Sequence, residues 1–358
     1  MKILFITDLY PVKNEEKTTP RTLLNFVRGW RNSGVEVDVL KPNFLLNSFV
    51  RRKPFYSTGL YENVYNVNYY SPFLGDVKQK LKGYSFTSYD IVVAHMPSGI
   101  LFADKLGLPF IAGIHNSDLE ILTNPLYSIH FKKRELVALE HSRAIACRSY
   151  VIMNKFLEMF PQFSDKTFVA PSGIDEKYIL NDFTHNINKE NLKIVTCANF
   201  KKRKNIDKLI IALKDIADVE LIIIGDGEGA DKLKAINRNC IFLGRLPNES
   251  VFDVLKNSDI FILPSVNETF GMVYLEAMAS GCISICTSND GVDGIIKNGE
   301  NGFTVEPNEE SIKNIIKKIQ DMDISELNII RENSLKTIRQ YTEKACCENY
   351  LSNIQKYM

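Results

Sequence analysis

The stretch Pro264–Gly281, PSVNETFGMVYLEAMASG, contains the most informative junction of this 358-residue chain. An apolar run of strand length ends at Pro264, and a polar loop leads through Gly271 into the helical segment Met272–Ala279. In open α/β sheets, ligands bind where a strand ends and the next helix begins. We therefore expect the chemistry of this protein to lie at such junctions.

Two carboxylates and three backbone donors gather in this stretch. Glu276 follows Glu268 by eight residues, about 80° around an ideal helix, so both can face one cleft. The backbone N–H groups of Gly271, Met272 and Val273 are first-turn donors suited to a phosphate. The alternative is a structural role, in which Asn267 caps the helix, Glu268 complements the helix dipole and Glu276 is a solvated helix residue.

Short apolar runs followed by helical periodicity recur on both sides of this junction. Before residue 150 they are Lys2–Thr7, Glu36–Leu40, Tyr89–Ala94, Pro109–Ile114 and Ala144–Cys147. They resume with Lys193–Ala198, Val219–Ile224, Cys240–Leu243, Asp259–Leu263 and Cys282–Cys286. Continuous β-branched runs that alternate with helices indicate parallel sheets covered on both faces. The sequence therefore predicts an α/β protein with two doubly wound domains, joined by the polar segment Leu180–Asn191.

Composition excludes several other classes of protein. With 24% charged and 45% hydrophobic residues, the chain is globular, and its net charge of +1 argues against bulk binding of nucleic acid. No run approaches the roughly 20 apolar residues of a spanning helix, and the first residues, MKILFITDLYP, are expected to form a strand, not a signal peptide. Seven cysteines without a C-x-x-C motif indicate reduced thiols in a cytoplasmic protein.

The segment ETFGMVYLEAMASG resembles the signature of the family 4 glycosyltransferases of the GT-B fold: a Glu, seven residues, a second Glu, and then A-M-A-x-G. The resemblance implies two Rossmann-like domains that face each other across a cleft. Residues 1–180 would bind the acceptor and residues 190–340 the nucleotide-sugar, and residues 341–358 would form a helix that returns to the first domain. It also implies that Glu268 is the catalytic carboxylate beside the donor sugar. Glu276 would hold the ribose hydroxyls, and the Gly271–Val273 helix start would receive the diphosphate.

Further segments match the family in the expected order. CANFKKRKNI (Cys197–Ile206) resembles G-R-L-x-x-x-K-G, which makes Lys204 the phosphate-binding lysine. The usual Arg of the family falls on Asn199, a donor-binding position that here carries no charge, and the adjacent basic residues either compensate or form a solvated turn. In IAGIHNSDLE, His115 matches the catalytic His that contacts the donor sugar, with a structural His as the alternative. For His95 both interpretations stay open.

The front half matches less closely. The segment Val12–Arg21, VKNEEKTTPR, stands where the family often has a Gly-Gly loop near the diphosphate. Its lack of glycine leaves open how this loop approaches the donor. The Tyr- and Asn-rich segment Phe55–Phe73 fits neither the strand nor the helix period and is expected to be an irregular insertion or a hairpin.

The implied reaction is retaining transfer of a sugar from a UDP- or GDP-sugar donor to an acceptor hydroxyl of a saccharide or a lipid-linked saccharide, without a cofactor or a metal. Two alternatives stay open, a nonhydrolysing nucleotide-sugar epimerase and a non-catalytic nucleotide-sugar-binding protein. Residues 1–180 carry 22 Lys and Arg against 17 Asp and Glu. The clusters Arg51–Lys53 and Lys78, Lys80 and Lys82 suit an anionic membrane surface on the cytoplasmic side, or serve solubility.

Overall fold

The computed structural model describes residues 1–13, 19–45, 56–69, 81, 86, 88–127 and 131–358. The chain divides into two compact units. The first comprises Met1–Arg148, Ile152–Pro171 and Glu343–Met358, and the second comprises Ser149–Val151 and Ser172–Thr342. The main crossing therefore falls between Pro171 and Ser172, and the segment Leu180–Asn191, expected from its polarity to be the linker, lies inside the second unit.

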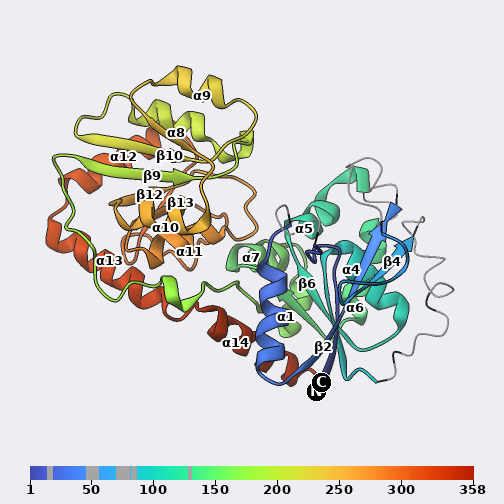
Figure 1. Ribbon diagram of the computed structural model, residues 1–358. Helices are drawn as coiled ribbons and strands as arrows, with labels where there is room; N and C mark the ends of the chain where they lie inside the picture. Colours follow the sequence, from blue (N-terminus) through green and yellow to red (C-terminus); the bar gives the residue numbers. More distant parts are fainter. Residues whose placement is uncertain (14–18, 46–55, 70–80, 82–85, 87, 128–130) are drawn as a thin grey trace. The chain divides into compact units, whose positions relative to one another are not determined.

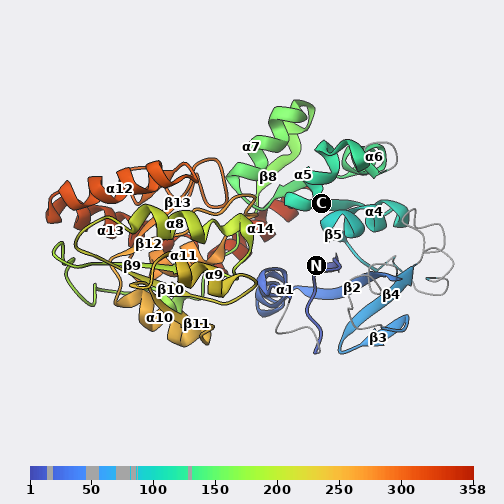
Figure 2. The same cartoon turned by 90° about the horizontal axis from the view of Figure 1, so that it is seen from above.

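The first unit is built on an eight-stranded sheet with the order β3-β4-β2-β1-β5-β6-β7-β8. Its strands are β1 Lys2–Ile6, β2 Glu36–Phe44, β3 Gly59–Tyr61, β4 Val64–Tyr69, β5 Ile91–His95, β6 Phe110–Ile114, β7 Ala144–Cys147 and β8 Thr167–Val169. Its described helices are α1 Thr22–Asn32, α4 Met96–Leu106, α5 Asn116–Thr123, α6 Lys133–His141, α7 Tyr150–Met159 and α14 Glu343–Lys356. All strand pairs are parallel except β3 with β4, a hairpin that extends the sheet beyond β2 (Figure 2).

The last helix, α14, packs beside α1 in the first unit (Figure 1). The Trp30 indole nitrogen of α1 donates to the carbonyl of Cys347 at 3.1 Å. Tyr350 makes edge contacts with Phe26 and Trp30, with ring centroids 5.2 Å apart in both pairs. Aromatic pairs of this geometry add to the area that they bury, so the chain end is firmly anchored.

The second unit is built on a six-stranded parallel sheet with the order β11-β10-β9-β12-β13-β14. Its strands are β9 Leu192–Cys197, β10 Val219–Ile224, β11 Ile241–Gly244, β12 Ile260–Ile262, β13 Ile283–Thr287 and β14 Phe303–Val305. Its helices are α8 Ile206–Leu213, α9 Ala230–Ile236, α10 Asn248–Lys256, α11 Met272–Ala279, α12 Glu309–Asp321 and α13 Ile324–Ile338. Figure 1 shows α8, α9 and α12 on one face of this sheet and α10, α11 and α13 on the other.

Helix α12 illustrates how the sequence specifies these elements. The Asn308 side chain accepts the Ser311 backbone N–H at 2.8 Å and caps the helix start. Ile312, Ile316 and Ile319 then recur at helical spacing and are fully buried. The predicted strands before residue 150 and after residue 190 are confirmed, since the apolar runs form strands of the two sheets and are largely buried except in the edge strand β11.

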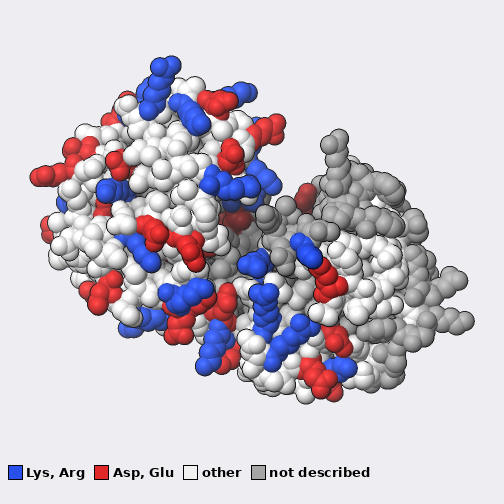
Figure 3. Space-filling model, in the orientation of Figure 1, with Lys and Arg blue, Asp and Glu red and all other residues white. Residues whose placement is uncertain are grey.

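Charged side chains are mixed on the described surface. On the face drawn in Figure 3, Lys and Arg alternate with Asp and Glu without a large patch of one sign. The basic clusters Arg51–Lys53 and Lys78, Lys80 and Lys82 lie outside the described residues. Among the residues that are described, no helix has both the length and the apolar character needed to cross a membrane.

Candidate active site

A cavity of about 310 Å³ opens in the second unit at the carboxyl ends of its strands. Cys197 and Ile224, the last residues of β9 and β10, line it. Its other lining residues are Ala198, Asn199, Gly225, Arg245, Leu246, Asn248, Val251, Met272, Val273 and Glu276. This is the edge at which parallel α/β sheets bind ligands.

The start of α11 presents backbone donors at this cavity. Gly271 is the N-cap, with φ of +90°, and a Cβ there would lie 2.7 Å from the Tyr274 ring. A side chain at this position would therefore be strained. The N–H of Tyr274 bonds to the Gly271 carbonyl at 3.1 Å, whereas those of Gly271, Met272 and Val273 have no hydrogen-bond partner in the described part of the chain. Unpaired N–H groups at a helix start attract anions.

Glu276 brings a carboxyl group to the same cavity. Within the described ranges its side chain has neither a hydrogen-bond partner nor an ion pair, and burial raises its pKa to about 7. A half-buried carboxylate without a partner is costly unless a ligand supplies donors. The pKa of the Cys197 thiol is raised to about 12, first by burial and also by Glu276, against the lowering effect of Lys204, so both charged groups lie near this sulfur.

A cluster of ion-paired side chains joins the loop after β9 to the loop after β12. Lys204 and Arg203 both pair with the Glu268 Oε2 atom, and the distance from Arg203 Nη1 is 3.1 Å. The side chains of Lys204 and Glu268 are 12% and 15% exposed, so solvent screens this pair only partly. Arg203 was one of several basic residues for which the sequence left a solvated turn open, and the structure gives it a partner.

Hydrogen bonds that involve the backbone also hold these two loops together. The Val266 N–H donates to the Arg203 carbonyl at 2.8 Å, and the Asn205 side chain donates to the Pro264 carbonyl at 2.7 Å. Buried Asp290, just after β13, accepts the backbone N–H of Glu268 at 2.7 Å. Asp290 was not predicted from the sequence, although its position just after a strand end is the kind of signal that identified the other residues.

Asn199 and Arg245 meet at the rim of the cavity. The Arg245 Nη2 atom donates to the Asn199 Oδ1 atom at 3.2 Å. Both side chains are exposed, and Arg245 is the one Lys or Arg among the described residues that line the cavity. Sequence reasoning missed Arg245, because the contact joins two strands that are separated by β10 in the sheet.

His115 lies in the first unit, where β6 leads into α5. Its Nε2 atom is 3.0 Å from His95 Nδ1, and His95 Nε2 is 3.1 Å from the Tyr350 hydroxyl. Burial lowers the pKa of both histidines well below 6.5, so both rings are neutral. The His115 backbone N–H donates to the Asp118 carboxyl at 2.7 Å. His95, for which the sequence left both interpretations open, is thus fully buried and bonded to His115 and Tyr350.

Two buried carboxyl groups lie at this helix start. Asp118 of α5 and Glu135 of α6 are 0% and 1% exposed, and their carboxyl groups interact electrostatically. Burial raises the pKa of Asp118 to about 7, and burial and the neighbouring Asp118 raise that of Glu135. Asp118 Oδ1 and both Glu135 oxygens are buried and have no hydrogen-bond partner in the described part of the unit. Such a pair is stable when it shares a proton.

Comparison with known proteins identifies the family. Residues 19–178 match the family described as "Glycosyltransferase Family 4", and residues 179–337 match "Glycosyl transferases group 1". The chain belongs to the family 4 glycosyltransferases. An uncharacterized glycosyltransferase of Methanocaldococcus jannaschii, MJ1178, is 30% identical over 215 residues, which cover 59% of this chain and 58% of that protein.

A second relative matches over more of its length. The UDP-Gal:alpha-D-GlcNAc-diphosphoundecaprenol alpha-1,3-galactosyltransferase of Escherichia coli is 27% identical over 279 residues, 68% of this chain and 69% of that protein. Among solved structures, Anabaena HepE in complex with UDP has a TM-score of 0.74 and 18% identity, covering 99% of this chain and 100% of that one. The predicted GT-B fold is confirmed.

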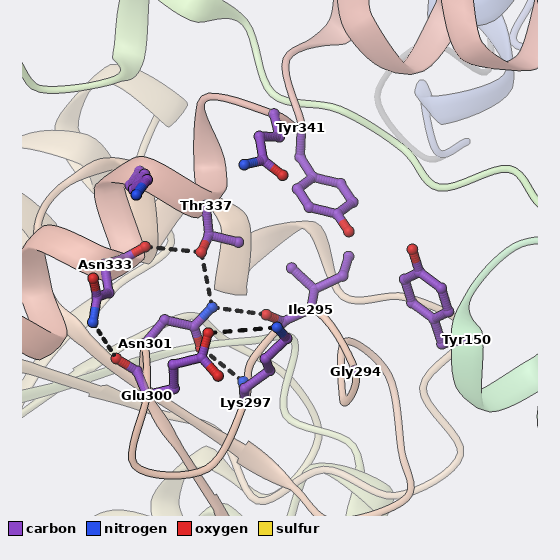
Figure 4. Close-up of a pocket in the computed structure, with 11 residues that line it drawn as sticks. Tyr150, Gly294, Ile295, Lys297, Glu300, Asn301, Asn333, Thr337 and Tyr341 are labelled. Atoms are coloured by element: carbon purple, nitrogen blue, oxygen red, sulfur yellow. Dashed lines mark hydrogen bonds and ion pairs between the residues drawn. The ribbon is translucent and has the colours of Figure 1, made fainter.

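The glycosyltransferase has another cavity in its second unit, of about 350 Å³, beside α13 (Figure 4). Three of its polar side chains, Lys297, Glu300 and Asn301, have partners within its wall. The Asn301 side chain donates to the Ile295 carbonyl at 2.9 Å and to the Thr337 hydroxyl at 3.0 Å, and Lys297 pairs with Glu300 at 3.4 Å. Because these groups already have partners, we place the candidate active site at the first cavity.

The first cavity collects four of the predicted donor-binding residues, Asn199, Met272, Val273 and Glu276. Gly271 caps the adjoining helix, and Lys204 pairs with Glu268 nearby. The expected 80° relation of the two glutamates on one helix is wrong, because α11 begins at Met272 and Glu268 lies in the loop before it. The roles of these residues and of His115 stay predictions.

Proposed function

We propose that this chain transfers a sugar from a UDP- or GDP-sugar to an acceptor hydroxyl with retention of configuration. The bond between the anomeric carbon and the diphosphate oxygen breaks, a bond to the acceptor oxygen forms on the same face, and the hydroxyl proton passes to the departing phosphate. The observation that carries this proposal is the convergence of unpaired α11 N–H groups and the unpartnered Glu276 carboxyl on one cavity.

Each predicted residue has a role suited to its chemistry. Lys204 and the α11 N–H groups neutralise the charge that develops on the departing diphosphate. Glu276 accepts hydrogen bonds from the ribose hydroxyls. Glu268 and His115 position the sugar. The Glu268 carboxylate is held by two cations, which supports a positioning role and not that of a nucleophile. The mechanism requires no cofactor or metal.

The donor site is tested by nucleotide binding. We expect Glu276→Ala to weaken UDP or GDP binding about 10- to 100-fold, the value of one to two charge-assisted hydrogen bonds. Isothermal titration calorimetry measures the effect, and Glu249→Ala on α10, outside the cavity lining, is the matched control. If neither nucleotide binds the wild-type chain, or if both variants bind alike, the proposed donor site is wrong.

The acceptor that we propose is a saccharide or a lipid-linked saccharide, with a role in polysaccharide synthesis. The lipid diphosphate-linked sugar in the printed name of the E. coli relative supports it. Retaining transfer predicts two results. Release of nucleoside diphosphate depends on the acceptor, and NMR of the product shows the same anomeric configuration, axial or equatorial, as the donor sugar. Interconversion of the donor sugar without acceptor would support an epimerase, and binding without turnover a non-catalytic protein.

We also propose peripheral binding to an anionic membrane on the cytoplasmic side. Leu126 is 90% exposed in the turn Pro125–Tyr127 and is followed by basic Lys132, Lys133 and Arg134 at the start of α6. An exposed leucine beside basic residues suits the boundary between headgroups and acyl chains.

A vesicle-binding experiment tests this surface. We expect Leu126→Asp to lower the affinity for vesicles that contain phosphatidylglycerol by roughly 10-fold, since a leucine side chain that leaves water gains about 1.5–3 kcal/mol. Leu60, 74% exposed on β3, provides the matched variant Leu60→Asp, which should bind as the wild type does. Equal loss in both variants, or no binding by the wild type, would refute this surface.

A further inference from the structure

A nucleotide-sugar brings two negative charges, on its diphosphate, into a site where two of the described cations already share one carboxylate. Lys204 and Arg203 share the Glu268 carboxylate. Asn199, at the end of β9, is neutral. Arg245 differs from these residues, because its one described side-chain partner is the uncharged Asn199 amide. Its positive charge is therefore fully available to a ligand.

We propose that Arg245 binds the donor diphosphate and supplies, from the loop after β11, the positive charge that Asn199 does not carry. The proposal rests on the nucleotide-sugar donor proposed above and adds a residue to that same site. In the sheet order β11-β10-β9, the two residues follow strands that flank β10. The Arg245 side chain must therefore reach across the carboxyl end of β10 to contact Asn199.

The end of β10 leaves room for this crossing. Gly225 follows the strand with φ of +133°, and a Cβ there would lie 1.9 Å from the Ala198 carbonyl oxygen. The Gly225 N–H donates to the Gly244 carbonyl at 2.8 Å, which draws the loop that carries Arg245 toward β10. Adjacent strands are about 4.8 Å apart, so the two intervals from β11 to β9 are bridged by the Arg245 side chain, its 3.2 Å hydrogen bond and the Asn199 side chain together.

The contact with Asn199 holds the guanidinium beside a polar residue of the cavity lining. The lining combines apolar Ile224, Leu246 and Val251, suited to a base, with polar groups at Asn199 and the α11 start. A guanidinium has five N–H donors, and the Asn199 bond uses one of them. The others can bind phosphate oxygens in pairs, the geometry that arginine favours.

Calorimetry with uridine, UMP and UDP, or the guanosine series if the wild type prefers it, separates phosphate from base contact. We expect Arg245→Gln to weaken UDP binding about 10- to 100-fold and uridine binding less than about 2-fold. The exchange variant Asn199→Arg/Arg245→Asn should recover most of the UDP affinity, because the charge returns to the same place from β9. Arg238→Gln, on an exposed loop outside the cavity lining, should have no effect.

An equal loss for uridine and UDP in Arg245→Gln would overturn the proposal and assign Arg245 to the base. Unchanged UDP binding in Arg245→Gln, while Glu276→Ala loses it, would remove Arg245 from the site and leave the proposed function standing. Absence of nucleotide binding by the wild type would instead refute the proposed function itself.

Discussion

Substitution of Lys204 with alanine is expected to lower kcat by about 100- to 1,000-fold, the effect of removing one preorganised group that stabilises transition-state charge. The Lys204 ammonium is mostly buried, at 12% exposure, so water replaces it poorly. Its loss also leaves Glu268 with Arg203 alone, at 3.1 Å. Steady-state kinetics with saturating donor give the measurement. Lys202→Ala, in the same turn but exposed, is the matched control.

A double-mutant cycle distinguishes loss of catalysis from loss of the ion pair. If Lys204 acts on the phosphate and also orients Glu268, Lys204→Ala/Glu268→Gln should lose less activity than the sum of the two single losses. Wild-type kcat in Lys204→Ala, or equal losses in Lys204→Ala and Lys202→Ala, would show that Lys204 has no specific role. Thermal unfolding of each variant separates a catalytic loss from simple instability.

The fold could be predicted because both sheets are built from continuous apolar runs. Parallel strands such as Val219–Ile224 form one apolar run that only Glu220 interrupts, so their bounds follow from the sequence. The short strands β8 and β14 were missed, since three residues carry no period. In the segment expected to be an insertion or a hairpin, the described residues form the hairpin β3–β4.

The candidate site could be predicted only where residues that lie close in the sequence also meet in the structure. Lys204, in the loop after β9, and Glu276, in helix α11, belong to recognisable strand-to-helix junctions. Arg245 contacts a residue from two strands away and Asp290 one from the neighbouring strand, so sheet order, not chain order, sets their contacts. The bond from His95 to Tyr350 joins residues 255 positions apart, a separation that no local pattern spans.

The double substitution Asp118→Asn/Glu135→Gln is expected to stabilise the protein relative to the wild type progressively as pH rises. Both carboxyls keep their proton in the folded state longer than in the unfolded chain, because burial raises their pKa values, that of Asp118 from 3.8 to about 7. The wild type therefore loses stability as pH rises from about 4 through about 7. The lost free energy is on the order of 1.4 kcal/mol for each pH unit in this window.

The amides of the double variant keep the shape of the two carboxyl groups but do not titrate. In Asp118→Asn the new amide oxygen still accepts the His115 N–H, and one of the two amides donates to the other. The buried histidines act in the opposite direction, since their lowered pKa values remove stability as pH falls below 6.5. Because both proteins contain these histidines, their contribution cancels in the difference in free energy of unfolding between the double variant and the wild type. Asp8 and Cys147, which also interact electrostatically with Asp118, are likewise unchanged.

Urea unfolding of the two proteins between about pH 4.5 and 8.5, the range that brackets the raised pKa values, measures the difference in free energy of unfolding. Glu140→Gln makes the same isosteric change at an exposed position of α6. Its free energy of unfolding should differ from that of the wild type by the same amount at every pH. A difference between the double variant and the wild type that stays flat over this range would show that Asp118 and Glu135 do not share a proton. In contrast, Glu135→Ala should unfold more easily by about 3–5 kcal/mol, because it leaves the Asp118 carboxyl buried without its partner.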